Sequence, residues 1–134
     1  DGQNVRDWIH VRDHCAGDLA VWQRGRVGEV YNLGGRSERT NLQLTHAILD
    51  ALGKPKSFIR YVPDRPGHDR RYAIDCGKSE RELGWRPAFV FEDGLRQTID
   101  WYRGHAEWIA AIRTGEYLKY YERQYGSLSA GSRT

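Results

Sequence analysis

Apolar residues recur every three or four positions in several segments, and this spacing predicts amphipathic helices. In the first of these segments Cys15, Leu19 and Trp22 share one face, which is expected to be buried. The longest apolar repeat predicts a single long helix. The expected helices cover residues 13–23, 41–52, 75–83, 92–113 and 117–125. Side chains that suit an N-cap, or a position next to one, stand at Asp13, Asn41 and Asp75.

Shorter stretches rich in β-branched and aromatic residues predict strands at residues 6–11, 29–33, 58–62 and 71–74. Residues 36–40 are expected to form a loop. The pattern therefore predicts a small mixed α/β lobe that is rich in helices, with short strands that need partners from outside the chain. Residues 1–126 would form this lobe, and the small polar residues 127–134 would form a flexible tail.

Length and composition limit the class of protein. The chain has 134 residues, enough for one domain with a hydrophobic core. It contains no secretory leader and no apolar run of the ~20 residues that a membrane span needs, so a cytoplasmic protein is expected. Cys15 and Cys76 are expected to be free thiols. The chain lacks methionine and opens at Asp1 almost directly on a strand, so a piece of a larger protein is expected.

The charge pattern favours a small anionic ligand. The formal net charge is +3, and basic residues are interspersed with acidic ones except between residues 60 and 71. Nucleic-acid binding would be better supported by a basic stripe along one helix, so it is not expected.

The segment 64–75 carries the strongest candidate chemistry, because it holds three arginines and a histidine around a Pro66-Gly67 turn. It reads Asp-Arg-Pro-Gly-His-Asp-Arg-Arg-Tyr-Ala-Ile-Asp. Arginines at a turn beside a strand are typical of a phosphate or diphosphate site, since the guanidinium donates two parallel hydrogen bonds. The alternative is a solvated loop whose arginines pair with Asp64 and Asp69. These residues alone leave both interpretations open.

The same segment resembles one found in the dTDP-glucose 4,6-dehydratases, a family of the extended short-chain dehydrogenases/reductases. The resemblance extends from residue 1 to about residue 125, so it covers nearly the whole chain. Four further segments resemble the family in the same order: Arg6–Val11 with Asp13-His14, Tyr31–Gly35 with Asn41-Leu42, Glu82–Pro87, and Gly94–Tyr102.

The resemblance implies a fold and a reaction. The chain would be the C-terminal, substrate-binding lobe of a Rossmann-type enzyme, and its partner would be the missing N-terminal Rossmann domain. That enzyme converts dTDP-glucose to dTDP-4-keto-6-deoxyglucose and water with bound NAD. Without that domain, exposed apolar surface would favour self-association. Another nucleotide-sugar epimerase, dehydratase or decarboxylase stays an alternative, as does a stand-alone module that binds an anion or a protein.

The resemblance also implies roles for single residues. Arg6 and Arg65 would pair with the diphosphate, and His68 would donate to a phosphate oxygen. Asn41 would offer its amide and the amides of its helix start. The full set of residues implied for substrate binding is Arg6, Asn41, Asp64, Arg65, Pro66, Gly67, His68 and Tyr125. Arg70 and Arg71 are instead expected to form structural salt bridges.

Two motifs of the superfamily are missing from the sequence. There is no Gly-rich strand–turn–helix for dinucleotide phosphates, and no tyrosine is followed four positions later by lysine. We therefore expect no catalytic residue, no metal site and no cofactor bound by this chain, with NAD held elsewhere in the parent enzyme. The chain alone is expected to be inactive.

Overall fold

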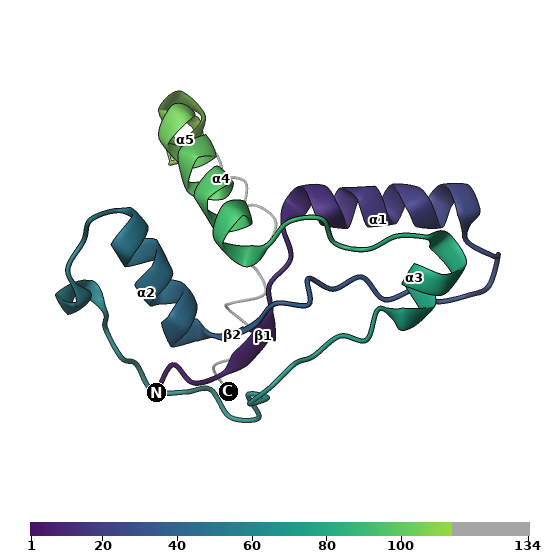
Figure 1. Cartoon of the computed structure of the whole chain (residues 1–134). Coiled ribbons are helices and arrows are strands. Elements are labelled where there is room, and N and C mark those ends of the chain that lie inside the picture. Colours follow the sequence, from purple (N-terminus) through teal and green to yellow (C-terminus); the bar gives the residue numbers. More distant parts are fainter. Residues whose placement is uncertain (114–134) are drawn as a thin grey trace, which may run out of the picture. The chain divides into compact units, whose positions relative to one another are not determined.

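The structure, a computed structural model, describes residues 1–113 and is a small, helix-rich α/β fold, as predicted. The chain divides into two compact units, residues 1–97 and 98–134, and each is described by itself. The predicted boundary at residue 126 and the predicted helix 117–125 lie outside the described residues. The elements are β1 (Val5–Asp7), α1 (Val11–Arg24), β2 (Glu38–Thr40), α2 (Asn41–Ala51), the 3-10 turn η1 (Lys56–Phe58), α3 (Gly77–Leu83), α4 (Phe91–Gly104) and α5 (Ala106–Arg113) (Figure 1).

Strand β1 lies between two partners. It pairs antiparallel with β2, with Val5 opposite Thr40 and Asp7 opposite Glu38. On its other side the Val5 amide donates to the Arg70 carbonyl over 2.8 Å, and the Tyr72 amide donates to the Val5 carbonyl over 3.1 Å. The predicted strand 71–74 is reduced to this parallel bridge. The arrangement places the segment that follows the Pro66-Gly67 turn directly beside β1.

Two further strand predictions are wrong for the described residues, at 29–33 and 58–62. A strand is defined by a hydrogen-bonded neighbour, and neither segment has one in this part of the chain. Strand 6–11 is also shorter than predicted, because α1 already begins at Val11. Conversely, β2 was predicted as a loop, since Glu38-Arg39-Thr40 shows no apolar alternation and forms a strand only through its pairing with β1.

Helix α1 begins differently from the prediction. Its N-cap is His10, whose Nδ1 accepts a hydrogen bond from the Arg12 amide, whereas Asp13 lies in the first turn. Asp13 is buried, with 4% of its surface exposed, and its two carboxylate oxygens accept from the amides of Ala88 and Phe89, each over 3.0 Å. Asp13 therefore fixes the start of α1 to the chain before α4.

The predicted buried face of α1 is wrong. Leu19 and Trp22 are 50% and 81% exposed, and Cys15 is exposed as well. The buried residues of the helix are instead Asp13, Gly17 and Ala20; Ala20 packs in a cluster with Leu83 of α3, and a Cβ added at Gly17 would lie 2.6 Å from the Leu33 side chain. Small side chains let neighbouring parts of the chain pack closely against the helix. The face of α1 with small side chains is therefore covered, and the face with large apolar side chains is not. The core cluster consists of Ala20, Cys76, Leu83 and Trp85.

Helices α2 and α3 are capped by the neighbours of the predicted residues. Thr40 is the N-cap of α2 and forms a capping box with Gln43, so Asn41 is the first helical residue. Cys76 is the N-cap of α3, while the Asp75 carboxylate accepts from the Gly77 amide over 2.8 Å. The place of Asn41 next to the N-cap is as predicted, whereas the cap of α3 lies one residue after the predicted Asp75. The helices themselves are where the pattern placed them.

The predicted helix 92–113 is two helices, because it is interrupted at His105 between α4 and α5. Glycine at position 104 has low helix propensity, and Nδ1 of His105 donates to the Trp101 carbonyl over 2.7 Å. The His105 ring also stacks on Trp101, with 4.2 Å between the centroids. Among residues 1–113 no helix is long and apolar enough to cross a membrane. Cys15 and Cys76 are unpaired, as predicted.

Candidate functional site

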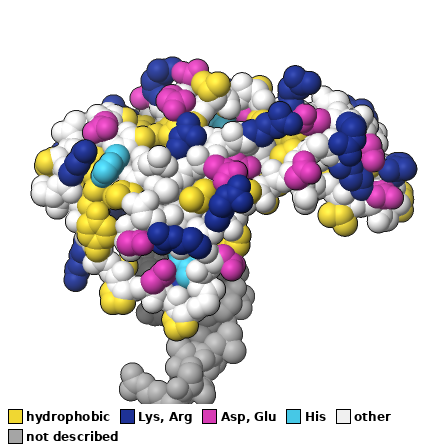
Figure 2. All heavy atoms as spheres, turned by 60° about the horizontal axis from the view of Figure 1, so that its bottom comes forward, with side chains coloured by type: hydrophobic (Ala, Val, Ile, Leu, Met, Phe, Trp, Pro, Cys, Tyr) yellow, Lys and Arg dark blue, Asp and Glu magenta, His cyan; other side chains and the backbone are white. Residues whose placement is uncertain are grey.

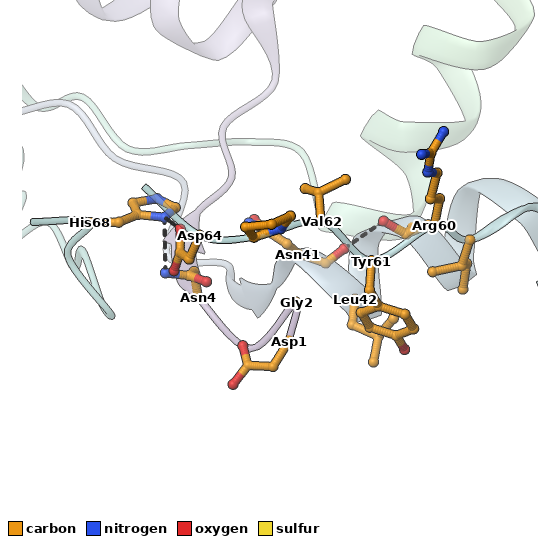
Figure 3. Close-up of a pocket in the computed structure, with 13 residues that line it drawn as sticks. Asp1, Gly2, Asn4, Asn41, Leu42, Arg60, Tyr61, Val62, Asp64 and His68 are labelled. Carbon is orange, nitrogen blue, oxygen red and sulfur yellow. Dashed lines mark hydrogen bonds and ion pairs between the residues drawn. The ribbon is translucent and has the colours of Figure 1, made fainter. Parts of the chain in front are cut away.

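A pocket with a volume of about 230 Å³ lies where the residues before β1, the start of α2 and the chain around the Pro66-Gly67 turn meet (Figure 3). Its wall includes three of the residues predicted for substrate binding, Asn41, Asp64 and His68. The pocket thus joins three segments that are distant in sequence: Asp1 to Asn4, the start of α2 and the turn segment. They meet because β1 hydrogen-bonds beside the turn segment.

His68 connects the turn to β1. Its Nε2 lies 2.8 Å from Nη2 of Arg6, and its Nδ1 lies 2.6 Å from Oδ1 of Asp64. Arginine can only donate, so Nε2 accepts and the ring proton is on Nδ1, which donates to Asp64. Arg6, His68 and Asp64 therefore form one hydrogen-bonded chain, of which Figure 3 shows the His68–Asp64 end.

Arg6 is half-buried and has no carboxylate within ion-pair distance in the described part of the chain. Its Nη1 donates to the Val5 carbonyl over 2.6 Å and its Nη2 to the Asp69 carbonyl over 3.0 Å. The guanidinium also lies over the Tyr72 ring, 4.2 Å from its centroid. The cation is thus held by neutral groups, and its charge is not balanced by a neighbouring acid.

Asn4 belongs to the same site, and the sequence analysis missed it. Its side chain is 5% exposed, and its Nδ2 donates to the Asp69 carbonyl over 3.3 Å and lies 3.4 Å from Nδ1 of His68. Its carbonyl accepts from the Asn41 amide over 3.0 Å. Asn4 joins the turn to the start of α2, a role that is visible only once β1 is paired, since the sequence signals nothing at this position.

Asn41 lines the pocket, but most amides of its helix start are already bonded. Its own amide donates to Asn4, the Leu42 amide donates to Gly2, and the Gln43 amide donates to the Thr40 hydroxyl. The prediction that these amides are offered to a ligand therefore has no support in this geometry. The side-chain amide of Asn41 remains the group that can face the pocket.

Arg6 and the turn residues Arg65, Pro66 and Gly67 do not line the pocket. Arg65, Pro66 and Gly67 are exposed on the turn, where Gly67 adopts a φ of +68°. The Arg65 guanidinium forms no hydrogen bond or ion pair with residues 1–113. Tyr125 lies outside the described residues.

The remaining arginines of the segment form structural salt bridges, as predicted. Arg70 pairs with Asp1 over 2.8 Å, and Arg71 makes two bonds of 2.7 and 2.8 Å to the Glu38 carboxylate. The alternative in which the arginines of the loop pair with Asp64 and Asp69 is wrong in its partners. Asp64 instead accepts from His68, and Asp69 accepts from the Tyr72 hydroxyl.

The bond from His68, together with that from the Arg65 amide, holds the pKa of Asp64 below its ordinary value of about 3.9. A depressed folded-state pKa means that Asp64 contributes stability at neutral pH and loses it as the pH falls through that lowered value. We expect an NMR titration of the Asp64 carboxyl carbon to have its midpoint below 3.9. In the His68→Ala variant the midpoint should rise, and an unchanged midpoint would contradict this pairing.

Several exposed charges elsewhere on the first unit are paired. Figure 2 shows basic and acidic side chains next to one another over the visible face. Arg26 pairs with Glu82 over 3.0 Å, and Tyr31 donates to the same carboxylate over 2.9 Å. The Tyr31 hydrogen bond is the main cause of the lowered pKa of Glu82. Among residues 1–113, Arg6 differs from exposed arginines without an ion pair, such as Arg12 and Arg65, because it is half-buried.

Gly34 and Gly35 lie too close to other parts of the chain to form a cradle for a dinucleotide phosphate. A Cβ added at Gly35 would lie 1.9 Å from the Trp8 carbonyl oxygen, and one at Gly34 would lie 2.5 Å from the Asp7 carboxylate. These two glycines therefore serve close packing within the chain and leave no open space for a phosphate. Among residues 1–113, these two glycines therefore do not form a phosphate loop for NAD.

Comparison with known proteins gives the relatives of the chain. The family whose sequence model matches residues 1–98 is described as GDP-mannose 4,6 dehydratase. The dTDP-glucose 4,6-dehydratase of Xanthomonas campestris pv. campestris is 51% identical over 126 residues, which cover 87% of this chain and 36% of that protein.

Solved structures agree in fold. The structure of dTDP-glucose 4,6-dehydratase from Streptomyces venezuelae, with NAD bound, matches with a TM-score of 0.77 and 53% identity, over 81% of this chain and 34% of that one. The UDP-glucose 4-epimerase of Thermotoga maritima, with UDP-glucose, matches with a TM-score of 0.72 and 33% identity, over 78% of this chain and 33% of that one.

The chain thus spans about a third of the length of the relatives it matches. The family match includes β1, the start of α2 and the whole turn segment, so the residues of the candidate site lie within it. The chain therefore belongs to the family described as GDP-mannose 4,6 dehydratase, within the extended short-chain dehydrogenases/reductases, and dTDP-glucose 4,6-dehydratases are its homologues.

Proposed function

We propose that this chain is the C-terminal, nucleotide-sugar-binding part of a dTDP-glucose 4,6-dehydratase, which converts dTDP-glucose to dTDP-4-keto-6-deoxyglucose and water. The identity of 51% to the Xanthomonas campestris enzyme supports the reaction class. In this proposal the part of the enzyme outside this chain, a Rossmann domain, binds NAD and carries the catalytic residues.

The observation that carries the proposal is the half-buried Arg6 without a carboxylate partner in the described part of the chain. Removing a cation from water is costly unless an anion compensates it. Arg65 on the neighbouring turn is a second arginine with no ion pair among residues 1–113. Two arginines without acids, beside a pocket, match the needs of a diphosphate.

The hydrogen-bonded chain suggests how the diphosphate is received. A phosphate oxygen would draw Nη2 of Arg6 away from Nε2 of His68. Once protonated there, His68 can donate to a second phosphate oxygen, while Asp64 stabilises the imidazolium through Nδ1. Asp64 thereby orients His68, and Asn41 contributes its side-chain amide from the pocket wall. Tyr125 remains a proposed contact through its ring or hydroxyl.

The test uses the full-length protein that contains this chain. Incubated with dTDP-glucose and NAD, it should form the 4-keto sugar, which is detected by its absorbance in alkali or by mass spectrometry. The pure 134-residue chain should form none under the same conditions. Failure of the full-length protein to react would overturn the proposed reaction, and turnover by the short chain would overturn the assignment of catalysis to another part.

A second candidate, a nucleotide-sugar epimerase, is favoured by the fold shared with the UDP-glucose 4-epimerase of Thermotoga maritima. The two are separated by offering UDP-glucose and dTDP-glucose in parallel. An epimerase would convert UDP-glucose to its C4 epimer without forming the 4-keto product. A stand-alone module that only binds an anion would bind dTDP and convert neither sugar, even as part of the full-length protein.

We also propose that the isolated chain self-associates and that the parent enzyme is cytoplasmic. Leu19, Trp22 and Val30 are exposed apolar side chains on the first unit, and exposed apolar surface drives association. Light scattering of the isolated chain should give the mass of a dimer or larger species. A monomer over a wide range of concentrations would contradict the proposed association.

A further inference from the structure

Tyr72 makes contacts that converge on Arg6. Its ring centroid lies 4.2 Å from the guanidinium carbon of Arg6. Its hydroxyl donates to the Asp69 carboxylate over 2.5 Å, and the carbonyl of the same Asp69 accepts from Nη2 of Arg6 over 3.0 Å. Its amide donates to Val5, the residue before Arg6. The ring is thus fixed at its backbone and at its hydroxyl, with one face against the cation.

The phenol is well suited to this fixed position. The hydrogen bond to Asp69, burial and the charge of Asp69 all raise the pKa of Tyr72. A raised pKa keeps the proton on the hydroxyl at neutral pH, so the bond to Asp69 persists and the ring carries no charge. Because the hydroxyl is directed to Asp69, the part of Tyr72 that meets Arg6 is the π face.

Arg6 needs such a partner because of its place on β1. The register sets Arg6 directly opposite Arg39 of β2, and like charges in a cross-strand pair are destabilising. The structure turns the two guanidiniums toward different aromatic rings, with Arg39 lying 5.1 Å from the centroid of Phe91. Arg39 also forms an ion pair with Glu92, whereas Arg6 has no acidic partner among the described residues.

We infer that Tyr72 is a positioning residue for the diphosphate site and acts through Arg6. The ring attracts the guanidinium without neutralising its charge, as a cation–π contact does, so Arg6 is oriented and still available to an anion. A carboxylate in the place of Tyr72 would hold Arg6 as firmly but would compete with the phosphate. This inference rests on the proposed function and adds to it a residue that does not touch the ligand.

The test compares dTDP affinities of full-length variants by calorimetry. Tyr72→Leu should weaken binding about threefold to tenfold, the range of a partly exposed cation–π contact. Tyr72→Phe keeps the ring and should restore most of the affinity. In the Arg6→Ala background, Tyr72→Leu should cause no further loss, because the residue through which it acts is gone. With dTDP-glucose as substrate, KM should rise in Tyr72→Leu while kcat stays near that of the wild type.

Tyr102→Leu is the matched control, since Tyr102 is 50% exposed, similar to the 44% of Tyr72, and its ring lies against Trp101 of the second unit. Tyr72→Gln provides a second non-aromatic variant should Tyr72→Leu not fold. Equal losses from Tyr72→Leu with and without Arg6 would overturn the inference and leave the proposed function intact. Absence of dTDP binding in the wild type, or no effect of Arg6→Ala, would instead overturn the proposed function and the inference with it.

Discussion

Replacing Arg65 with alanine in the full-length protein is expected to weaken dTDP binding about tenfold to a hundredfold. A charge-assisted arginine–phosphate bond contributes roughly 1.5–3 kcal/mol, more than a neutral hydrogen bond. The Arg65 side chain has no hydrogen-bond or ion-pair partner among residues 1–113, so its removal breaks no contact of that kind there. Isothermal titration calorimetry of wild type and Arg65→Ala with dTDP measures the difference.

Arg113→Ala serves as the control, because Arg113 is an exposed arginine at the end of α5. It should leave the affinity within about twofold of the wild type. The melting temperatures of both variants should stay close to that of the wild type. Equal affinities of Arg65→Ala and wild type would mean that the exposed turn takes no part in binding, and the diphosphate contact would then have to come from Arg6 and other residues.

Trp85→Ala is expected to have the largest effect on stability, a loss of about 3–5 kcal/mol in the free energy of unfolding. Trp85 is 6% exposed and packs in the cluster with Ala20, Cys76 and Leu83. Its Nε1 donates to the Asp13 carbonyl over 3.1 Å, so alanine would leave a cavity and remove this hydrogen bond. Urea unfolding of the 134-residue chain, followed by far-ultraviolet circular dichroism, gives the change.

Trp22→Ala is the same chemical change at a site that is 81% exposed. It should alter the free energy of unfolding by less than about 0.5 kcal/mol. Comparing the two substitutions also tests which face of α1 is covered. A loss at Trp22 as large as that at Trp85 would show that Trp22 is buried in solution, either within the chain or between two copies of it.

The parts of the site that could be predicted from sequence are local. The arginines and His68 stand within one short segment, and the turn is encoded by Pro66-Gly67, so the motif could be recognised without knowing the fold. The presence of the helices could also be predicted, because the periodicity of apolar residues depends only on residues close together in sequence. Arg6 was implied by resemblance, and the structure then places it 2.8 Å from His68.

The parts that could not be predicted depend on which segments become neighbours. Asn4 and Tyr72 enter the site only because β1 pairs with residues 70–72. Asp13 is a good N-cap by its type, yet its carboxylate caps the amides of Ala88 and Phe89, 75 or more residues away. The buried residues of α1 are Asp13, Gly17 and Ala20, which apolar periodicity does not single out, and only the folded neighbours Leu33 and Leu83 show that this face is covered.

The register of β1 also determines whether a positive or a negative side chain faces the candidate site. Adjacent side chains of a strand point to opposite faces. In β1, Arg6 contacts His68, whereas the Asp7 carboxylate accepts a hydrogen bond from the Ser37 amide. A slip of one residue along β1 would put Asp7 in the place of Arg6 and turn an attractive site for a diphosphate into a repulsive one. The few hydrogen bonds at Val5 fix the register of β1. Through that register they also determine the sign of the charge that the lobe presents to a ligand.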